Sequence, residues 1–223
     1  MLPTDQEAAA LKEKLLTMAS LAIAATHNAL KSLVDRDDEL AQAVEANDNQ
    51  IDDLEKEIDE LSITLLSRAP LASDLRMITV AMKITHDLER VGDEATSISR
   101  RAINLNAEPQ LKDYVDLPRM GQMAIDMLKS ALDAFIDKDA EKAREIIPRD
   151  KDVDSLNKQM QRELASYMIE NPANITRALH LMEISKRVER IADHATNIAE
   201  VVVFLLEGRD IRHTIKKKVA GPA

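Results

Sequence analysis

The chain carries one ten-residue sequence twice, and the two copies lie one hundred residues apart. Residues 89–98 read ERVGDEATSI and residues 189–198 read ERIADHATNI, so six of the ten positions are identical. The similarity extends upstream, where residues 47–54 (NDNQIDDL) match residues 149–156 (RDKDVDSL) at an offset of 102. A repeat of this length is too long for a solenoid and suits a small helical bundle. The sequence therefore predicts two tandem units that arose by internal duplication.

The composition predicts that both units are helical. The 223 residues include only four aromatic residues and four glycines, whereas alanine, leucine, glutamate and lysine, which are good helix formers, are abundant. Apolar residues in the predicted helices recur at alternating spacings of three and four, which is typical of coiled-coil seams. We therefore predict an all-α fold of two antiparallel three-helix bundles, of the spectrin-repeat type, covering residues 1–107 and 108–223.

Local signals place the helices of the first unit. Asp37 lies in the charged turn DRDD (residues 35–38) and can cap the second helix by accepting hydrogen bonds from its free backbone N–H groups. Pro70 is expected to end that helix, because proline disfavours helical dihedral angles in the residue before it. Ser73 or Asp74 is expected to cap the third helix. These signals predict helices at about residues 4–34, 38–68 and 73–104.

The second unit is expected to repeat this plan. Its helices should break at residues 137–139 (DKD) and 171–174 (NPAN), and Gly208 should end its last helix. Pro148 is a difference between the units, because no proline stands at the matching position of the first unit. It removes a backbone hydrogen bond, so we expect a kink just before Asp150.

Pairs of acidic residues flank the predicted seams. Glu89 and Asp93 lie one turn apart on one face of the third helix, beside the seam, and Asp48 and Asp52 have the same spacing on the second helix. If these helices pack antiparallel, the four carboxylates share one small patch. The matching quartet of the second unit is Asp150, Asp154, Glu189 and Asp193.

Clustered carboxylates repel one another unless a positive group lies among them. All-oxygen sets of this kind suit hard cations such as Mg²⁺, Ca²⁺, Mn²⁺ or ferric iron, and zinc is a further possibility. Gly92 indicates crowding at this turn, since glycine inside a helix costs about 1 kcal/mol relative to alanine. The alternative is a solvated acidic face whose charge is balanced by nearby basic side chains, for which Arg90, Arg100 and Lys56 are available.

Two further function classes can be weighed from the sequence. A di-iron carboxylate enzyme usually needs the Glu-x-x-His pattern, but Glu89 and Glu189 are followed three residues on by Gly92 and Ala192. The chain also lacks the glycine-rich phosphate loop that nucleotide hydrolysis uses. We therefore predict that the protein is not an enzyme, with a metal-dependent enzyme or a metal store as the alternative function.

Charge and cysteine content limit the partners and the compartment. The formal net charge of −10 and the scarcity of aromatic residues argue against a nucleic-acid partner. There is no cysteine, and the longest strongly apolar run, at residues 201–206, is far too short to span a bilayer. We expect a cytoplasmic protein that meets a membrane only through its partners.

Two longer segments carry a resemblance to a known family. Residues 71–98 (LASDLRMITVAMKITHDLERVGDEATSI) and 171–198 (NPANITRALHLMEISKRVERIADHATNI) resemble the two signature helices of the PhoU family, bacterial regulators of phosphate uptake. The resemblance covers nearly the whole chain. It implies multinuclear metal clusters, often of iron, bound by the eight acidic residues Asp48, Asp52, Glu89, Asp93, Asp150, Asp154, Glu189 and Asp193.

The resemblance also implies a role and partners. PhoU proteins are negative regulators that link the phosphate-specific ABC transporter, through its ATPase subunit, to a membrane sensor histidine kinase. The phosphate-starvation response then stays off while phosphate is plentiful. For this chain we accordingly expect an adaptor that binds those two partners, contains metal and forms a homodimer.

The histidines depart from the family pattern. The family motif commonly has a histidine after its aspartate, but here Glu94 takes this position in the first unit and only His194 keeps it in the second. The two metal sites are therefore expected to differ in affinity or in the metal that they bind. The remaining histidines have no counterpart in the other unit and are expected to be surface or packing residues: His27, His86, His180 and His213.

Overall fold

Residues 3–68 and 71–211 are described by the structure, a computed structural model. Throughout these two ranges every regular element is a helix, as predicted, and no helix is both long enough and apolar enough to cross a bilayer. The α-helices, with two 3₁₀ turns between them, are α1 (Pro3–Val34), α2 (Asp38–Leu66), α3 (Ala72–Asn106), α4 (Asp116–Asp137), α5 (Ala140–Ile146), η1 (Ile147–Arg149), α6 (Asp150–Glu170), η2 (Pro172–Asn174) and α7 (Ile175–Glu207).

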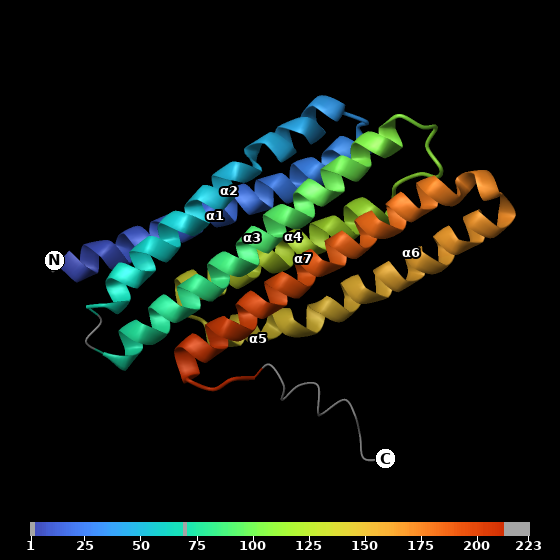
Figure 1. Cartoon of the computed structure of the whole chain (residues 1–223). Helices are drawn as coiled ribbons and strands as arrows, with labels where there is room; N and C mark the ends of the chain where they lie inside the picture. The colour runs from blue at the N-terminus through green and yellow to red at the C-terminus, as the bar shows by residue number, and fades with distance from the viewer. Residues whose placement is uncertain (1–2, 69–70, 212–223) are drawn as a thin grey trace, which may run out of the picture.

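The helices form two bundles that lie side by side (Figure 1). One bundle contains α1, α2 and α3, and the other contains α4, the broken helix α5–α6, and α7. In the middle of the molecule α3 packs against α7, running in the opposite direction, and α1 packs against α4. Buried apolar side chains from both bundles join one continuous core. The predicted boundary between residues 107 and 108 falls just after α3, and the division into two domains stays a prediction.

Matching turns begin the second helix of each bundle. The Asp37 carboxylate accepts a hydrogen bond from the Leu40 N–H at 2.9 Å, and Asp139, 102 positions later, accepts one from the Lys142 N–H at 3.0 Å. The residues just before these caps, Arg36 and Lys138, are both left-handed, with φ of 55°. The predicted cap at Asp37 and the predicted break at residues 137–139 are thus confirmed.

The start of α3 differs from its prediction. The helix begins at Ala72, and its N-cap is Leu71, whose side chain makes no capping hydrogen bond. The prediction of a cap at Ser73 or Asp74 was therefore wrong. Asp74 lies instead in the first turn, where its negative charge favours the positive end of the helix dipole. The second helix ends at Leu66, two residues before its predicted end, and Pro70 lies outside the described residues.

The second bundle breaks where its sequence predicts. Pro148 lies in the 3₁₀ turn η1, which separates α5 from α6, whereas α2 of the first bundle is continuous. At the other end of this bundle, α7 ends at Gly208 in a left-handed conformation, with φ of 70°. The effect of Pro148 is that α6 begins at Asp150, so this acidic residue lies at a helix start rather than inside a helix.

Candidate metal centre

The first acidic quartet lies where α2 packs against α3 at Gly92. A Cβ atom at position 92 would lie 2.9 Å from Ile51 Cδ1 and 3.1 Å from Asp48 Oδ1. Both distances are below ordinary van der Waals contact, so a side chain at position 92 would force the side chains of Ile51 and Asp48 to move. Glycine at this position therefore allows the carboxylate of Asp48 on α2 to lie directly against α3.

Electrostatic effects show that carboxylates from both helices share one patch. Burial raises the pKa of Glu89 to about 7, and repulsion from Asp93 on α3 and from Glu55 and Asp52 on α2 adds to this effect. Burial also raises the pKa of Asp48, with further repulsion from Asp52 and Asp93. These four acidic residues thus influence one another electrostatically, although within the described residues no three of them bring donor atoms to within 4.8 Å of one another.

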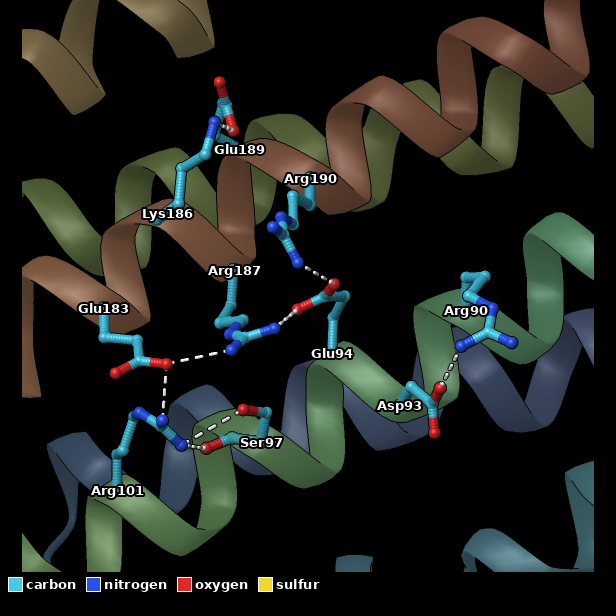
Figure 2. A network of polar contacts seen from close by, with 10 residues as sticks. All are labelled: Arg90, Asp93, Glu94, Ser97, Arg101, Glu183, Lys186, Arg187, Glu189 and Arg190. Carbon is cyan, nitrogen blue, oxygen red and sulfur yellow. Dashed lines mark hydrogen bonds and ion pairs between the residues drawn. The ribbon is translucent and has the colours of Figure 1, made fainter.

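One arginine provides the neighbouring positive charge. Arg90 Nε lies 2.9 Å from Glu89 Oε2, and another nitrogen of its guanidinium donates a hydrogen bond of 2.9 Å to Asp93 (Figure 2). The contact with Glu89 lacks hydrogen-bond geometry, and within the described part of the chain this buried oxygen has no hydrogen-bond partner. Arg100 and Lys56 pair with other acids, Glu45 and Asp53. Arg90 thus contacts two quartet residues directly, and Arg100 and Lys56 act on Asp48 and Asp52 only at longer range.

Two residues beside the quartet were not identified from the sequence. One donor atom each from Glu55, His86 and Glu89 lie within 4.8 Å of one another, close enough to hold a metal ion. Glu55 lies seven residues after Asp48, and His86 lies seven residues before Asp93. This heptad spacing puts each residue on the same side of its helix as a quartet residue. The spacing was the sequence signal from which their place beside the quartet could have been predicted.

The second quartet lies between α6 and α7. The pKa of Glu189 is raised by burial, and the carboxylates of Asp193 and Asp154 contribute to the rise. The Lys186 ammonium, one turn earlier on α7, donates a hydrogen bond to Glu189 Oε2 and opposes it (Figure 2). These three acids therefore share one patch, and Asp150 lies one turn before Asp154 on α6.

The residues that break the family pattern lie between the two bundles. Glu94 on α3 is only 6% exposed and accepts hydrogen bonds from Arg187 at 3.0 Å and Arg190 at 3.3 Å, both on α7 (Figure 2). His194 Nδ1 on α7 lies 2.8 Å from Asp87 Oδ1 on α3. Both side chains face the opposite bundle.

These two contacts are copies of one another with the charges exchanged. Position 94 matches 194 and position 187 matches 87, at an offset of one hundred. In the first contact, Glu94 on α3 pairs with Arg187 on α7. In its copy, His194 on α7 stands at the position that matches Glu94, and Asp87 on α3 stands at the position that matches Arg187. Beside them runs a polar groove of about 680 Å³, which Asp93, Arg90 and Asp193 help to line. Both quartets thus border one groove.

Replacing Glu89 with glutamine should stabilise the protein at pH 8, in the presence of a chelator, by about 1 to 2 kcal/mol. The folded pKa of about 7 lies above the ordinary value of 4.5, so the folded state holds this proton more tightly than the unfolded state does. The contribution of this proton to the free energy of unfolding is full below pH 4.5 and is lost as the pH rises through 7. Urea unfolding followed by circular dichroism would measure the difference.

At pH 5 the Glu89→Gln variant should differ little from the wild-type protein, because the native carboxyl is then protonated. Glu60→Gln, on the exposed face of α2, serves as the control and should have little effect at either pH. An equal effect of Glu89→Gln at both pH values would contradict the explanation.

Comparison with known proteins places these features in a family. The sequence model of the PhoU domain matches the chain twice, over residues 15–102 and 117–202. A Pseudomonas aeruginosa protein named phosphate-specific transport system accessory protein PhoU homolog is 42% identical, over 91% of this chain and 85% of the relative. A protein of the same name from Aquifex aeolicus is 41% identical, over 93% and 95%. These names describe a transport accessory protein and not an enzyme.

Solved structures agree with this placement. The crystal structure of PhoU from Pseudomonas aeruginosa superposes with a TM-score of 0.89 at 40% identity, covering 92% of this chain and 99% of that one. The phosphate transport system regulatory protein PhoU from Streptococcus pneumoniae superposes with a TM-score of 0.84 at 27% identity, covering 93% and 98%. The fold of two tandem helical bundles is therefore shared across these proteins.

Proposed function

This chain is a member of the PhoU family, and from that premise we propose that it is a negative regulator of phosphate uptake and of the phosphate-starvation response. The observation that carries the proposal is the double match to the family, which covers both bundles. Two relatives are named as accessory proteins of phosphate-specific transport. They are 42% and 41% identical to this chain over the aligned residues, which make up 91% and 93% of it.

We further propose that the protein acts in the cytoplasm as an adaptor between the transporter ATPase subunit and a sensor histidine kinase. Two bundles of similar plan offer two related surfaces, so one chain can bind two different proteins. The differences between the bundles support distinct partners. Pro148 breaks the helix of only one bundle, and the matching positions 94 and 194 carry glutamate and histidine.

The acidic quartets are proposed to hold metal ions, of which iron, manganese, magnesium and zinc are candidates. Support comes from the convergence of Asp48, Asp52, Glu89 and Asp93 and from the raised pKa of Glu89. Metal ligation by Glu89 and Asp93 would release Arg90, which now contacts both carboxylates and also lines the groove between the bundles. The charge of this groove would then report metal loading to a bound partner.

Deletion of the gene tests the regulatory role. In medium rich in phosphate, the deletion strain should produce the phosphatase of the starvation response, and the wild-type chain supplied in trans should restore repression. Phosphatase activity in whole cells is the measurement. Phosphatase levels that stay at the wild-type value after deletion would contradict the proposal.

A second experiment distinguishes a protein-binding adaptor from a metal store. Tagged wild-type protein and a Glu89→Ala, Glu189→Ala double variant are used to pull down the ATPase subunit and the kinase, and bound metal is measured in both. An adaptor should retain a few ions per chain and both partners, and the double variant should lose metal. Loading of many ions per chain, with neither partner recovered, would favour a metal store.

A further inference from the structure

Most of the net negative charge of this chain lies on α2. The helix contains ten acidic residues and one basic residue, Lys56, so its net charge is −9 in a chain whose formal net charge is −10. The matching segment of the second unit, residues 140–168, contains six acidic and six basic residues and is neutral. These two segments form opposite edges of the molecule (Figure 1). The duplicated segments have therefore diverged strongly in charge.

Basic side chains near α2 leave most of this charge unbalanced. Among the described residues, Lys14 on α1 and Arg100 on α3 each form one ion pair with α2, at 2.5 and 3.0 Å, and Lys56 forms one within the helix. His86 lies 4.0 Å from a carboxylate of α2 and adds positive charge only when it is protonated. Like charges one turn apart destabilise a helix. A cationic surface bound along α2 would relieve this repulsion.

The outward face of α2 combines carboxylates with an exposed apolar side chain. Asp53, Glu57 and Glu60 recur at spacings of four and three, so they lie on one face of the helix. The side chains of Asp53 and Glu57 are 68% and 53% exposed. Ile63 follows on the same face and is 64% exposed, and Leu71, beyond the turn that leads to α3, is 60% exposed. Exposed apolar side chains that adjoin charged ones are a feature of protein-binding surfaces.

The matching face of the second unit lacks this combination. At an offset of 102, the three acids and the isoleucine of the α2 face are replaced by residues that are small, uncharged or basic: Ser155, Gln159, Arg162 and Ala165. The charge and the apolar side chain have thus changed together on one face of one unit. Solvation of a helix requires no such joint change, whereas recognition of one partner does.

We propose that the outward face of α2, from Asp53 to Ile63, is the docking surface for a protein whose own surface carries lysine and arginine beside an apolar contact. The charge of α2 identifies this occupant. An anionic membrane or a nucleic acid would be repelled. None of the other α-helices carries a net positive charge, so the helices of a second copy of this chain do not supply the complement.

This inference rests on the proposed adaptor function and assigns one of its two contacts to the first bundle. Complementary charges accelerate association, and salt screens them. The contact should therefore form rapidly and weaken as the salt concentration rises. It leaves the polar groove between the bundles and the face of α6 available to the other partner.

The test gives α2 the outward face of the second unit through three substitutions in the full-length chain: Asp53→Ser, Glu57→Gln and Glu60→Arg. Affinities for the purified ATPase subunit and for the detergent-solubilised sensor kinase are measured separately by biolayer interferometry at low and high salt. The triple variant should bind one of these two proteins more weakly by about tenfold or more, with a smaller dependence on salt. Addition of Ile63→Ala should weaken that binding further.

A matched control carries the same change of net charge on exposed positions of the second bundle: Glu145→Arg, Asp152→Ser and Glu170→Gln. It should bind both proteins like the wild-type chain. An equal loss in this control would overturn the proposal, because net charge alone would then explain the effect. Circular dichroism of each variant checks that it is folded.

Two further results would overturn the proposal. One is binding of both proteins by the triple variant with wild-type affinity. The other is a change of oligomeric state in the triple variant, measured by sedimentation equilibrium, which would identify a second copy of the chain as the occupant. If the wild-type chain binds neither protein, the adaptor function fails and this inference fails with it. Wild-type binding that the triple variant retains refutes the α2 surface alone.

Discussion

Replacing Arg187 with methionine is expected to lower the free energy of unfolding by about 3 kcal/mol. Arg187 on α7 donates hydrogen bonds to Glu94 on α3 at 3.0 Å and to Glu183 at 2.8 Å. The Glu94 carboxylate is almost completely buried and would keep only the 3.3 Å contact with Arg190. A buried charge that loses its principal partner is strongly destabilising, because the cost of removing the carboxylate from bulk water is then poorly compensated. Urea unfolding followed by circular dichroism would give the change, with the m-value unaltered.

Two further variants define the source of this effect. Arg100→Met removes a comparable pair with Glu45, but the Arg100 side chain is 63% exposed, so its cost should stay below about 1 kcal/mol. The Arg187→Met, Glu94→Leu double variant should recover most of the lost stability, because no buried charge is left behind. If Arg187→Met costs no more than Arg100→Met, the contact does not stabilise the packing of α3 on α7.

A valine in place of Gly121 should cost about 2 to 3 kcal/mol, which for a chain of this size corresponds to a fall in melting temperature of roughly 4 to 12 °C. Gly121 on α4 faces Leu30 on α1, and a Cβ atom at position 121 would lie 2.1 Å from Leu30 Cδ1. Leu30 is itself buried, so its side chain would have to adopt another conformation within the contact between α1 and α4. The two bundles would have to separate locally or repack. Differential scanning calorimetry would measure the shift.

Combining Gly121→Val with Leu30→Ala tests whether the two positions meet. Leu30→Ala alone should destabilise the protein by about 2 to 5 kcal/mol, because it leaves a cavity. The valine should fill part of this cavity, so the double variant should be more stable than the sum of the single effects indicates. Strictly additive effects would show that α1 and α4 do not pack at this point.

The features that were predictable from sequence depend on chemistry within a few residues. Asp37 caps α2, Pro148 interrupts the helix before Asp150, and Gly208 ends α7, all through local backbone requirements. The placement of each acidic pair on one face of its own helix also followed, because the spacing of four and the heptad seam fix which helical face each acid occupies. Leu71 was missed as the N-cap of α3 because it offers no side-chain hydrogen bond that would mark it.

The features that were missed depend on which helices are neighbours. Glu55 and His86 lie on different helices, and each alone looks like a surface residue, so their proximity required the relative positions of α2 and α3. Glu94 and His194 lie next to the repeated aspartates in sequence and were therefore expected to modify the metal sites. Their contacts are with the opposite bundle, because the side chain after the motif aspartate points away from the quartet and toward the α3–α7 interface.

The exchange of charges between α3 and α7 makes the two halves of this chain unable to replace one another. Two copies of the first half, packed in the same way, would set Glu94 against Asp87, and two copies of the second would set His194 against Arg187. Each like-for-like pairing brings together groups that cannot neutralise one another. After duplication, each half has therefore become specific for packing against the other half. Any exchange of halves between neighbouring chains must still join a first half to a second.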